Sequence, residues 1–280
     1  MQRGNITATR VKPESAQPLR LHVLRSERLS PHFVRVTLGG GDIAHFRPMG
    51  YDQWFRLFLP AGPDAAASLG RVPERLTTLS YLKLLGGAKE TRPVLRNYTV
   101  RAHRAESPEG PELDVDFVLH GHGDDGAAGP AATWARGCAP GDMVVLVDEG
   151  TGFRLPEGVH QVALAADESG LPALAGVLAS LPADTTGWAV AEVPTAEDRQ
   201  KLTAPPGVEV VWVDRVDRGG AEAGVPGAAA LARARELPLP DGPLYGWAVG
   251  ESGLATGLRR HWVAQGVPKD RIMFCGYWKH

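Results

Sequence analysis

Residues 96–135 read RNYTVRAHRAESPEGPELDVDFVLHGHGDDGAAGPAATWA, and the expected fold is built outward from them. The first residues alternate as those of a β-strand do, so Arg96, Tyr98 and Val100 share one face. Thr99 lies on the opposite face. A guanidinium can hold a phosphate, an aromatic ring can lie against a flat ligand, and a hydroxyl can bond to a ring nitrogen. This strand therefore offers side chains that suit a flat, phosphorylated ligand.

A second strand is predicted over residues 112–120 from the same alternation. Its apolar side consists of Leu113, Val115, Phe117 and Leu119. Its other side consists of Asp114, Asp116, Val118 and His120.

Residues 129–135, GPAATWA, predict the start of a short helix with Pro130 in its first turn. The first N–H groups of a helix have no intrahelical acceptor, so they favour an anion such as a pyrophosphate. The strand at 96–100 and this helix start together predict a cradle for a flavin dinucleotide.

In these segments the chain resembles the siderophore-interacting protein family, the flavin-dependent ferric-siderophore reductases of the ferredoxin-NADP reductase superfamily. The resemblance covers nearly the whole chain, because it continues in family order through DQWFRLFLP (52–60), ADESGLPAL (166–174), WAVGE (247–251) and GYWK (276–279). One position departs from the family pattern G-P-A-S-x-W-A, since Ala132 stands where the serine usually is. Thr133 is the neighbouring hydroxyl that can replace it.

The resemblance implies two bound nucleotides. The residues that it assigns to FAD are Arg96, Tyr98, Thr99, Val118, His120, Gly129, Ala131, Ala132, Thr133 and Trp134. The residues that it assigns to NADPH or NADH are Asp167, Glu168, Ser169, Gly250 and Glu251. Arg199 and Lys201 are candidates for a 2′-phosphate clamp, and an equally open alternative is that they are solvated surface charges.

The substrate side is predicted from residues 52–60, which resemble the family's D-x-H-x-K-L stretch with Trp54 at the histidine and Arg56 at the lysine. Strand alternation places Trp54, Arg56 and Phe58 on one face, so a cation stands between two aromatic rings. We expect Arg56 to attract an anionic ferric chelate, and Lys279 beside Trp278 to act as a second cation. The alternative is that Arg56 is an ordinary surface arginine.

Composition limits the classes of function. The chain has 280 residues, 43% hydrophobic residues and a formal net charge of −2, so nucleic acid is not an expected partner. Cys138 and Cys275 form no CxxC pair, which argues against a disulfide framework, a structural zinc and an in-chain iron–sulfur cluster.

Residues 1–18 lack the apolar core of a signal peptide, and no run of about 18 apolar residues occurs. We expect a cytoplasmic monomer with a frayed N-terminus and no membrane insertion.

Two domains are predicted. Residues 1–155 contain about six strands, one short helix and a long loop at 61–92, which is typical of an antiparallel Greek-key β-barrel that binds FAD. Residues 156–280 alternate five apolar strands with helices, one of them over 195–202, and predict a doubly wound parallel α/β sheet that binds NAD(P)H. Ligands of such sheets bind beyond the carboxyl ends of the strands, where the strand order reverses, so 167–170 and 250–252 are the expected binding segments.

Two other patterns in the chain carry less weight. Gly121–Gly126 matches GxGxxG, but it opens no helix directly and two aspartates would repel a pyrophosphate, so we interpret it as a hairpin turn. His120 and His122 could share a strand face, but a metal site needs three or four ligands, so no metal is expected.

The expected function is that of an FAD-dependent oxidoreductase that uses NAD(P)H to reduce ferric siderophores and releases ferrous iron in the cytoplasm. A flavin suits this task because it accepts electrons in pairs and passes them on singly. Reduction weakens the hold of hard oxygen ligands on iron. The alternatives are a ferredoxin or flavodoxin reductase of the same superfamily and a flavin-containing siderophore carrier without turnover.

Overall fold

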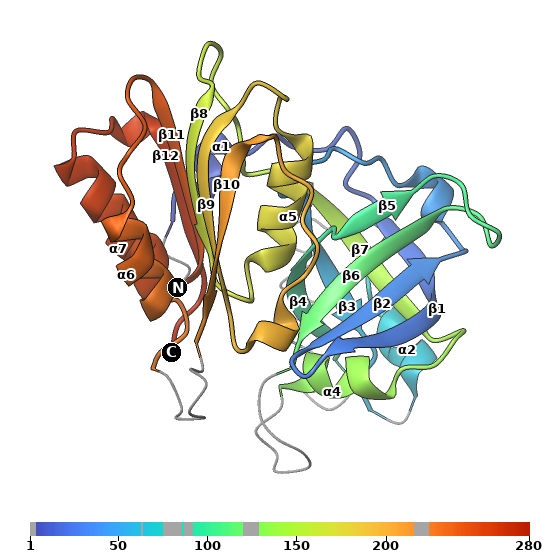
Figure 1. Ribbon diagram of the computed structural model, residues 1–280. Helices are drawn as coiled ribbons and strands as arrows, with labels where there is room; N and C mark the ends of the chain where they lie inside the picture. The colour runs from blue at the N-terminus through green and yellow to red at the C-terminus, as the bar shows by residue number, and fades with distance from the viewer. Residues whose placement is uncertain (1–3, 63, 75–85, 87–91, 120–128, 216–223) are drawn as a thin grey trace. The chain divides into compact units, whose positions relative to one another are not determined.

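The computed structural model describes residues 4–62, 64–74, 86, 92–119, 129–215 and 224–280. The chain forms two compact units (Figure 1). The barrel unit consists of Lys12–Met49 and Gln53–Gly150. The sheet unit consists of Met1–Val11, Gly50–Asp52 and Thr151–His280, so two short segments from the first part of the chain belong to the second unit.

Seven antiparallel strands make up the described part of the barrel unit. They are β1 (Pro18–Ser30), β2 (Phe33–Gly39), β3 (Trp54–Leu59), β4 (Val94–Thr99), β5 (Ala102–Arg104), β6 (Glu112–Val118) and β7 (Met143–Gly150). The accompanying helices are η1 (Ile43–His45), α2 (Ala65–Gly70) and α4 (Pro130–Gly137).

The sheet closes on itself through a short connection. Its strand order is β4-β3-β7-β1-β2-β6-β5, so the strands at its two ends are consecutive in sequence. Val100 and Arg101 join them, and their N–H groups donate to the carbonyls of Gln53 and Asp114 at 2.8 and 2.9 Å. The predicted antiparallel barrel is confirmed.

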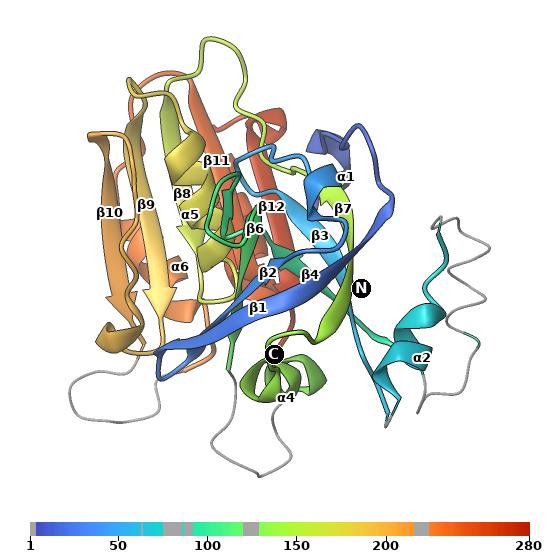
Figure 2. The same cartoon turned by 90° about the vertical axis from the view of Figure 1, so that its right-hand side faces the viewer.

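The barrel core comes from the alternating apolar positions of its strands, because every second side chain of a strand points inward. Helix α4 adds Ala131, Ala132 and Ala135 to this core. Phe58 belongs to a separate cluster with Leu69 of helix α2, which lies over a different part of the barrel from α4 (Figure 2).

The sheet unit contains five parallel strands in the order β10-β9-β8-β11-β12, which confirms the predicted doubly wound sheet. The strands are β8 (Gln161–Ala166), β9 (Thr186–Val193), β10 (Gly207–Asp214), β11 (Leu244–Glu251) and β12 (Ile272–Trp278). The helices are α1 (Ile6–Thr9), α5 (Leu171–Ser180), α6 (Ala228–Glu236), α7 (Ser252–Ala264), η3 (Ala196–Asp198) and η4 (Lys269–Arg271). Helices α6 and α7 cover one face of the sheet and α5 covers the other (Figure 1). No helix in the described ranges is long and apolar enough to cross a membrane.

The predicted helix over 195–202 is wrong, because only the single 3₁₀ turn η3 forms there. The carboxylate of Asp198 accepts hydrogen bonds from the backbone N–H and hydroxyl of Thr195 at 3.0 and 2.8 Å, which closes one turn. Pro205 and Pro206 follow shortly afterwards and disfavour helical continuation.

The N-terminal segment is also more ordered than predicted. Asn5 donates to the carbonyl of Ile272 at 2.7 Å and accepts from the N–H of Phe274 at 2.9 Å, so its amide mimics a neighbouring strand along the edge strand β12. Val11 pairs with Thr151. The expectation of a frayed N-terminus is therefore wrong for residues 4–11.

Candidate functional site

Three aromatic rings from different elements meet at one end of the barrel core. Tyr98 of β4 lies 4.3 Å from Phe117 of β6, and Phe117 lies 5.6 Å from Trp134 of α4, measured between ring centroids. Burial raises the pKa of the Tyr98 phenol, so its hydroxyl stays protonated at neutral pH. The indole Nε1 of Trp134 is buried and finds no acceptor among the described residues. The rings form an apolar platform with one unused buried donor.

The register of β3 and β4 sorts the predicted side chains onto two faces. Tyr98 lies opposite Phe55 and Arg96 opposite Leu57, whereas Thr99 lies opposite Trp54 on the other face. Arg96 is exposed, and its Nη1 donates to the carbonyl of Leu95 at 2.8 Å. Thr99 is buried. The predicted flavin contacts of β4 therefore divide between both faces of the strand.

Helix α4 begins without a side-chain cap, because its N-cap residue is Gly129. The hydroxyl of Thr133 is on the exposed side and donates back to the carbonyl of Gly129 at 3.4 Å. Ala132 packs into the barrel core, where a serine hydroxyl would be buried. Val118 is half-buried at the end of β6, and His120 lies outside the described residues. The uncapped helix start, the ring platform and the unused indole donor fit a flavin dinucleotide.

Arg56 is held by an acidic neighbour. Its Nε lies 2.8 Å from Oε1 of Glu149, and a third of the Arg56 side chain remains exposed. Trp54 is half-buried on the same face of β3. Phe58, the second aromatic residue predicted on this face, is fully buried in the cluster beneath α2.

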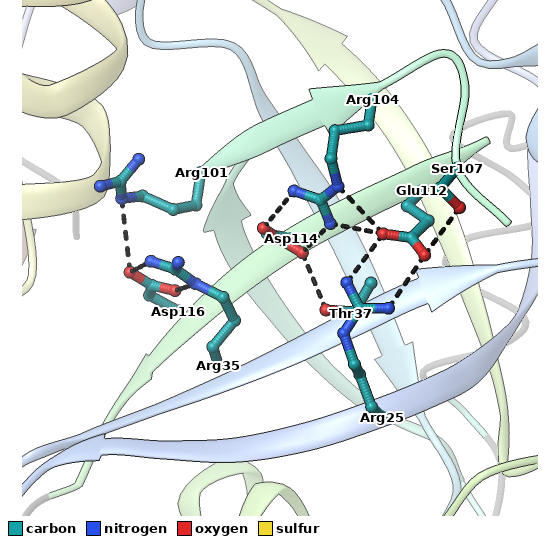
Figure 3. A network of polar contacts seen from close by, with 9 residues as sticks. All are labelled: Arg25, Arg35, Thr37, Arg101, Arg104, Ser107, Glu112, Asp114 and Asp116. Atoms are coloured by element: carbon teal, nitrogen blue, oxygen red, sulfur yellow. Dashed lines mark hydrogen bonds and ion pairs between the residues drawn. The ribbon is translucent and has the colours of Figure 1, made fainter. Parts of the chain in front are cut away.

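A carboxylate ladder runs along β6, and sequence reasoning missed it (Figure 3). It consists of Glu112, Asp114 and Asp116, which are all buried. Arginines from β1, β2 and β5 and from the β4–β5 connection pair with them (Figure 3). The sequence signal is the acidic residue at every second position of ELDVD, but nothing local identifies the arginines.

The geometry of the ladder is that of strong ion pairs. Arg25 binds both carboxylate oxygens of Glu112 at 2.9 and 2.7 Å, and Arg104 bridges Glu112 and Asp114 at 2.7 Å each. Hydrogen bonds, the strongest from Arg25, hold the pKa of Glu112 well below its usual value. Burial alone would raise the pKa of Asp114, but bonds from Arg104 and Thr37 outweigh it and lower that pKa. The ladder ties β6, which carries Phe117 of the ring platform, to β1, β2 and β5.

In the sheet unit, Asp167 follows β8 and is completely buried. Its Oδ1 accepts hydrogen bonds from the N–H and the hydroxyl of Ser169 at 2.9 and 2.6 Å, and its Oδ2 accepts from the N–H of Glu251 at 2.6 Å. Burial, followed by repulsion from Glu168, raises the pKa of Asp167. The structure thus brings the predicted segments 167–170 and 250–252 together.

Glu168 is held by an arginine that the sequence analysis missed. Both carboxylate oxygens of Glu168 bind Arg215, at 2.7 and 2.8 Å, and Arg215 also binds Glu192 at 2.8 Å. Glu192 accepts further bonds from the N–H groups of Gly227 and Ala230 at the start of α6. We call the carboxyl ends of these strands, with the residues that follow them, the rim of the sheet. At this rim Glu168, Arg215 and Glu192 form a connected network of charges.

The remaining predicted residues are placed as follows. Arg199 is exposed and binds both carboxylate oxygens of Asp214, at 2.9 and 2.6 Å, and Lys201 is exposed. The carbonyl of Trp278 accepts a bond from the Ser252 hydroxyl at 2.7 Å, and Lys279 is exposed. Arg56 and Trp54 belong to the barrel unit, whereas Trp278 and Lys279 belong to the sheet unit.

Comparison with known families identifies the fold and its cofactor class. Residues 22–152 match the family described as "Siderophore-interacting FAD-binding domain", and residues 159–280 match the family described as "Siderophore-interacting protein". The chain belongs to the siderophore-interacting protein family.

Several relatives have informative names. The chain is 30% identical over 274 residues to "Ferric vibriobactin reductase ViuB" of Vibrio cholerae, covering 95% of this chain and 91% of that protein. It is 28% identical over 261 residues to the "NADPH-dependent ferric-chelate reductase" of Escherichia coli, covering 92% and 91%. The crystal structure of a siderophore utilization protein from T. fusca is similar with a TM-score of 0.76, 30% identity, and coverage of 97% of this chain and 96% of that one.

An uncharacterised protein of Mycobacterium tuberculosis is 38% identical over 197 residues, which is 70% of this chain. The match spans 65% of the length of that relative.

Proposed function

We propose that this protein is a cytoplasmic, monomeric flavoprotein that takes electrons from NAD(P)H and reduces ferric siderophores, releasing ferrous iron. Its cofactors are FAD and a nicotinamide nucleotide. The observation that carries the proposal is the pairing of a ring platform with an uncapped helix start in a barrel of the siderophore-interacting FAD-binding family. The names of the relatives from Vibrio cholerae and Escherichia coli support the ferric substrate.

The residues of the barrel unit hold and orient the cofactor. Arg96 and the first N–H groups of α4, at Ala131 and Ala132, bind the diphosphate, because both offer donors to an anion. Tyr98 supports the flavin ring and Thr99 bonds to its polar edge, while Gly129, Val118, His120, Thr133 and Trp134 complete the cradle. FAD, when bound, supplies the exchange between paired and single electrons.

The residues of the sheet unit receive the electron donor. Asp167, Glu168, Ser169, Gly250 and Glu251 form the rim at which the nicotinamide nucleotide binds. Arg199 and Lys201 contact its 2′-phosphate. To make this contact, Arg199 releases the carboxylate of Asp214, to which it is bound in the structure.

The substrate is held by cations beside aromatic rings. Arg56 and Trp54 of the barrel unit contact the ferric chelate, and Trp278 and Lys279 of the sheet unit are separate candidates for a substrate contact. A guanidinium and an ammonium both attract an anionic chelate, but the guanidinium presents a flat fork of donors and the ammonium a compact charge.

The cradle is tested with the double variant Arg96→Ala plus Tyr98→Ala, assayed by FAD content after purification and by equilibrium binding of added FAD. Both readouts should fall at least tenfold, because the diphosphate contact and the ring support are removed together. Arg28→Ala is the matched control, since Arg28 is an exposed arginine of the same unit outside the proposed cradle. A double variant that keeps stoichiometric FAD with unchanged affinity would falsify this location of the cofactor.

A further inference from the structure

The helix starts at the reversal point of the parallel sheet are the expected seat of a phosphate group. Strands β8 and β11 are neighbours there, and α5 and α7 follow them on opposite faces of the sheet (Figure 1). In doubly wound sheets the N–H groups of such helix starts bind the diphosphate of a dinucleotide. A diphosphate can use these groups only where they are not already bonded.

The donors of Ser169, Gly170 and Leu171, immediately before and at the start of α5, are bonded within the chain. The N–H and hydroxyl of Ser169 both donate to Asp167 Oδ1. The N–H of Gly170 donates to the carbonyl of Asp167 at 3.0 Å, and that of Leu171 to the carbonyl of Glu168 at 3.4 Å. Pro172, the second residue of α5, has no N–H to offer.

Two donors at the start of α7, the N–H groups of Glu251 and Gly253, are bonded within the chain as well. The N–H of Glu251, the N-cap residue, donates to Asp167 Oδ2, so one carboxylate spans the starts of two helices. The N–H of Gly253 donates to the side chain of Glu251 itself. Glycine at position 250 leaves room for the carboxylate. A Cβ at Gly250, whose φ is +123°, would lie 2.5 Å from the carboxyl carbon of Asp167.

The charge of the rim opposes a further anion. Four buried carboxyl groups belong to these segments, Asp167, Glu168, Glu192 and Glu251, and Arg215 forms ion pairs with Glu168 and Glu192. A diphosphate at this point would meet acidic side chains and backbone donors that are already bonded within the chain.

We infer that the carboxyl group of Asp167 occupies the phosphate seat of this sheet, so the diphosphate of the nicotinamide nucleotide is not bound by the N–H groups of Ser169, Glu251 and Gly253. The rim instead takes the uncharged nicotinamide riboside half, whose hydroxyl and amide groups donate to carboxylate oxygens. This inference rests on the proposed function only because it names the ligand as a nicotinamide nucleotide.

The test follows the backbone amide signals of Ser169, Glu251 and Gly253 by NMR while inorganic pyrophosphate is added to the FAD-loaded protein. In the unmodified protein these signals should not move at millimolar pyrophosphate. In Asp167→Ala they should shift saturably, because removal of the carboxylate frees the donors and leaves room for an added anion. The matched control is Asp184→Ala, which removes an exposed carboxylate paired with His160 in the same unit and should gain no response.

Two outcomes overturn the inference. One is a saturable shift of these amides in the unmodified protein, a result that needs no variant to fold. The other is a folded Asp167→Ala protein, checked by circular dichroism, whose amides do not respond. The titration uses no ferric substrate and no turnover, so a failure of the proposed reductase activity leaves its result intact.

Discussion

Arg56 keeps its guanidinium on the surface of the barrel unit while Glu149 partly neutralises it. The local charge can therefore be changed in either direction. Removal of Arg56 makes this surface more negative, and removal of the Glu149 charge makes it more positive. A partly exposed ion pair also leaves the cation within reach of a ligand.

We predict that Arg56→Ala raises KM for an anionic ferric siderophore several-fold, with a larger effect at low salt because exposed charges are screened by ions. FAD content and the reduction of a small uncharged acceptor should stay near those of the unmodified protein. Glu149→Gln is the matched control, since it releases the cation and should lower KM for the same chelate. Steady-state kinetics at two ionic strengths measure both variants, and equal losses with both acceptors would make Arg56 a structural residue.

At the scale of elements, the carboxylate ladder of β6 is a source of stability with a defined pH dependence. Hydrogen bonds from arginines lower the pKa of Glu112, so its folded pKa lies below the unfolded value of about 4.3. Such a group stabilises the fold at pH values above the unfolded pKa, and the contribution is lost as the pH falls through the folded pKa.

We therefore predict that Glu112→Gln lowers the free energy of unfolding by about 1 to 3 kcal/mol at pH 7, because charge-assisted hydrogen bonds to a buried carboxylate are lost while both arginines stay partly exposed to solvent. The difference from the unmodified protein should shrink as the pH is lowered from 5 towards 2. Denaturation followed by circular dichroism measures it, with the exposed Glu109→Gln as control. A difference that stays constant over this range would contradict the role of the ionised carboxylate.

The N-terminal segment offers a second prediction at this scale. Asn5→Ala should speed hydrogen exchange at the N–H of Phe274, because that group loses its acceptor on the edge of the sheet. Thr9→Ala, whose hydroxyl makes a weaker 3.4 Å contact within the segment, serves as control. Unchanged exchange in the Asn5 variant would show that the segment does not protect β12.

Sequence reasoning succeeded where structure is local. Alternation in β6 and the strand–helix rhythm of the second unit predicted elements whose type follows from the local order of apolar and polar residues. It failed where the partner is distant in the chain. Arg25 pairs with Glu112, and Asn5 with β12, through contacts that no local pattern encodes. The contacts of Asp167 belong to this second kind, because Glu251 is 84 positions away.

At the scale of the whole molecule, the chain alternates between two units that each have their own core. Asp52 and Gln53 are neighbours in sequence but belong to different units. Asp52 accepts bonds from the N–H groups of Gly152 and Phe153, and Gln53 bonds to Asp148. The point between Asp52 and Gln53 where the chain passes from one unit to the other is therefore anchored on both sides, which suits the proposal that the two units bind different nucleotides.

The most direct test of the central proposal is an anaerobic assay that follows NAD(P)H oxidation with a ferric siderophore while a ferrous-specific chelator traps the product. The account predicts a yellow, FAD-containing protein that forms about two trapped ferrous ions for each nicotinamide nucleotide oxidised, since the donor gives electrons in pairs and each iron accepts one. Reduction of the bound flavin without any ferrous product, or purification without flavin under conditions that preserve the fold, would contradict it.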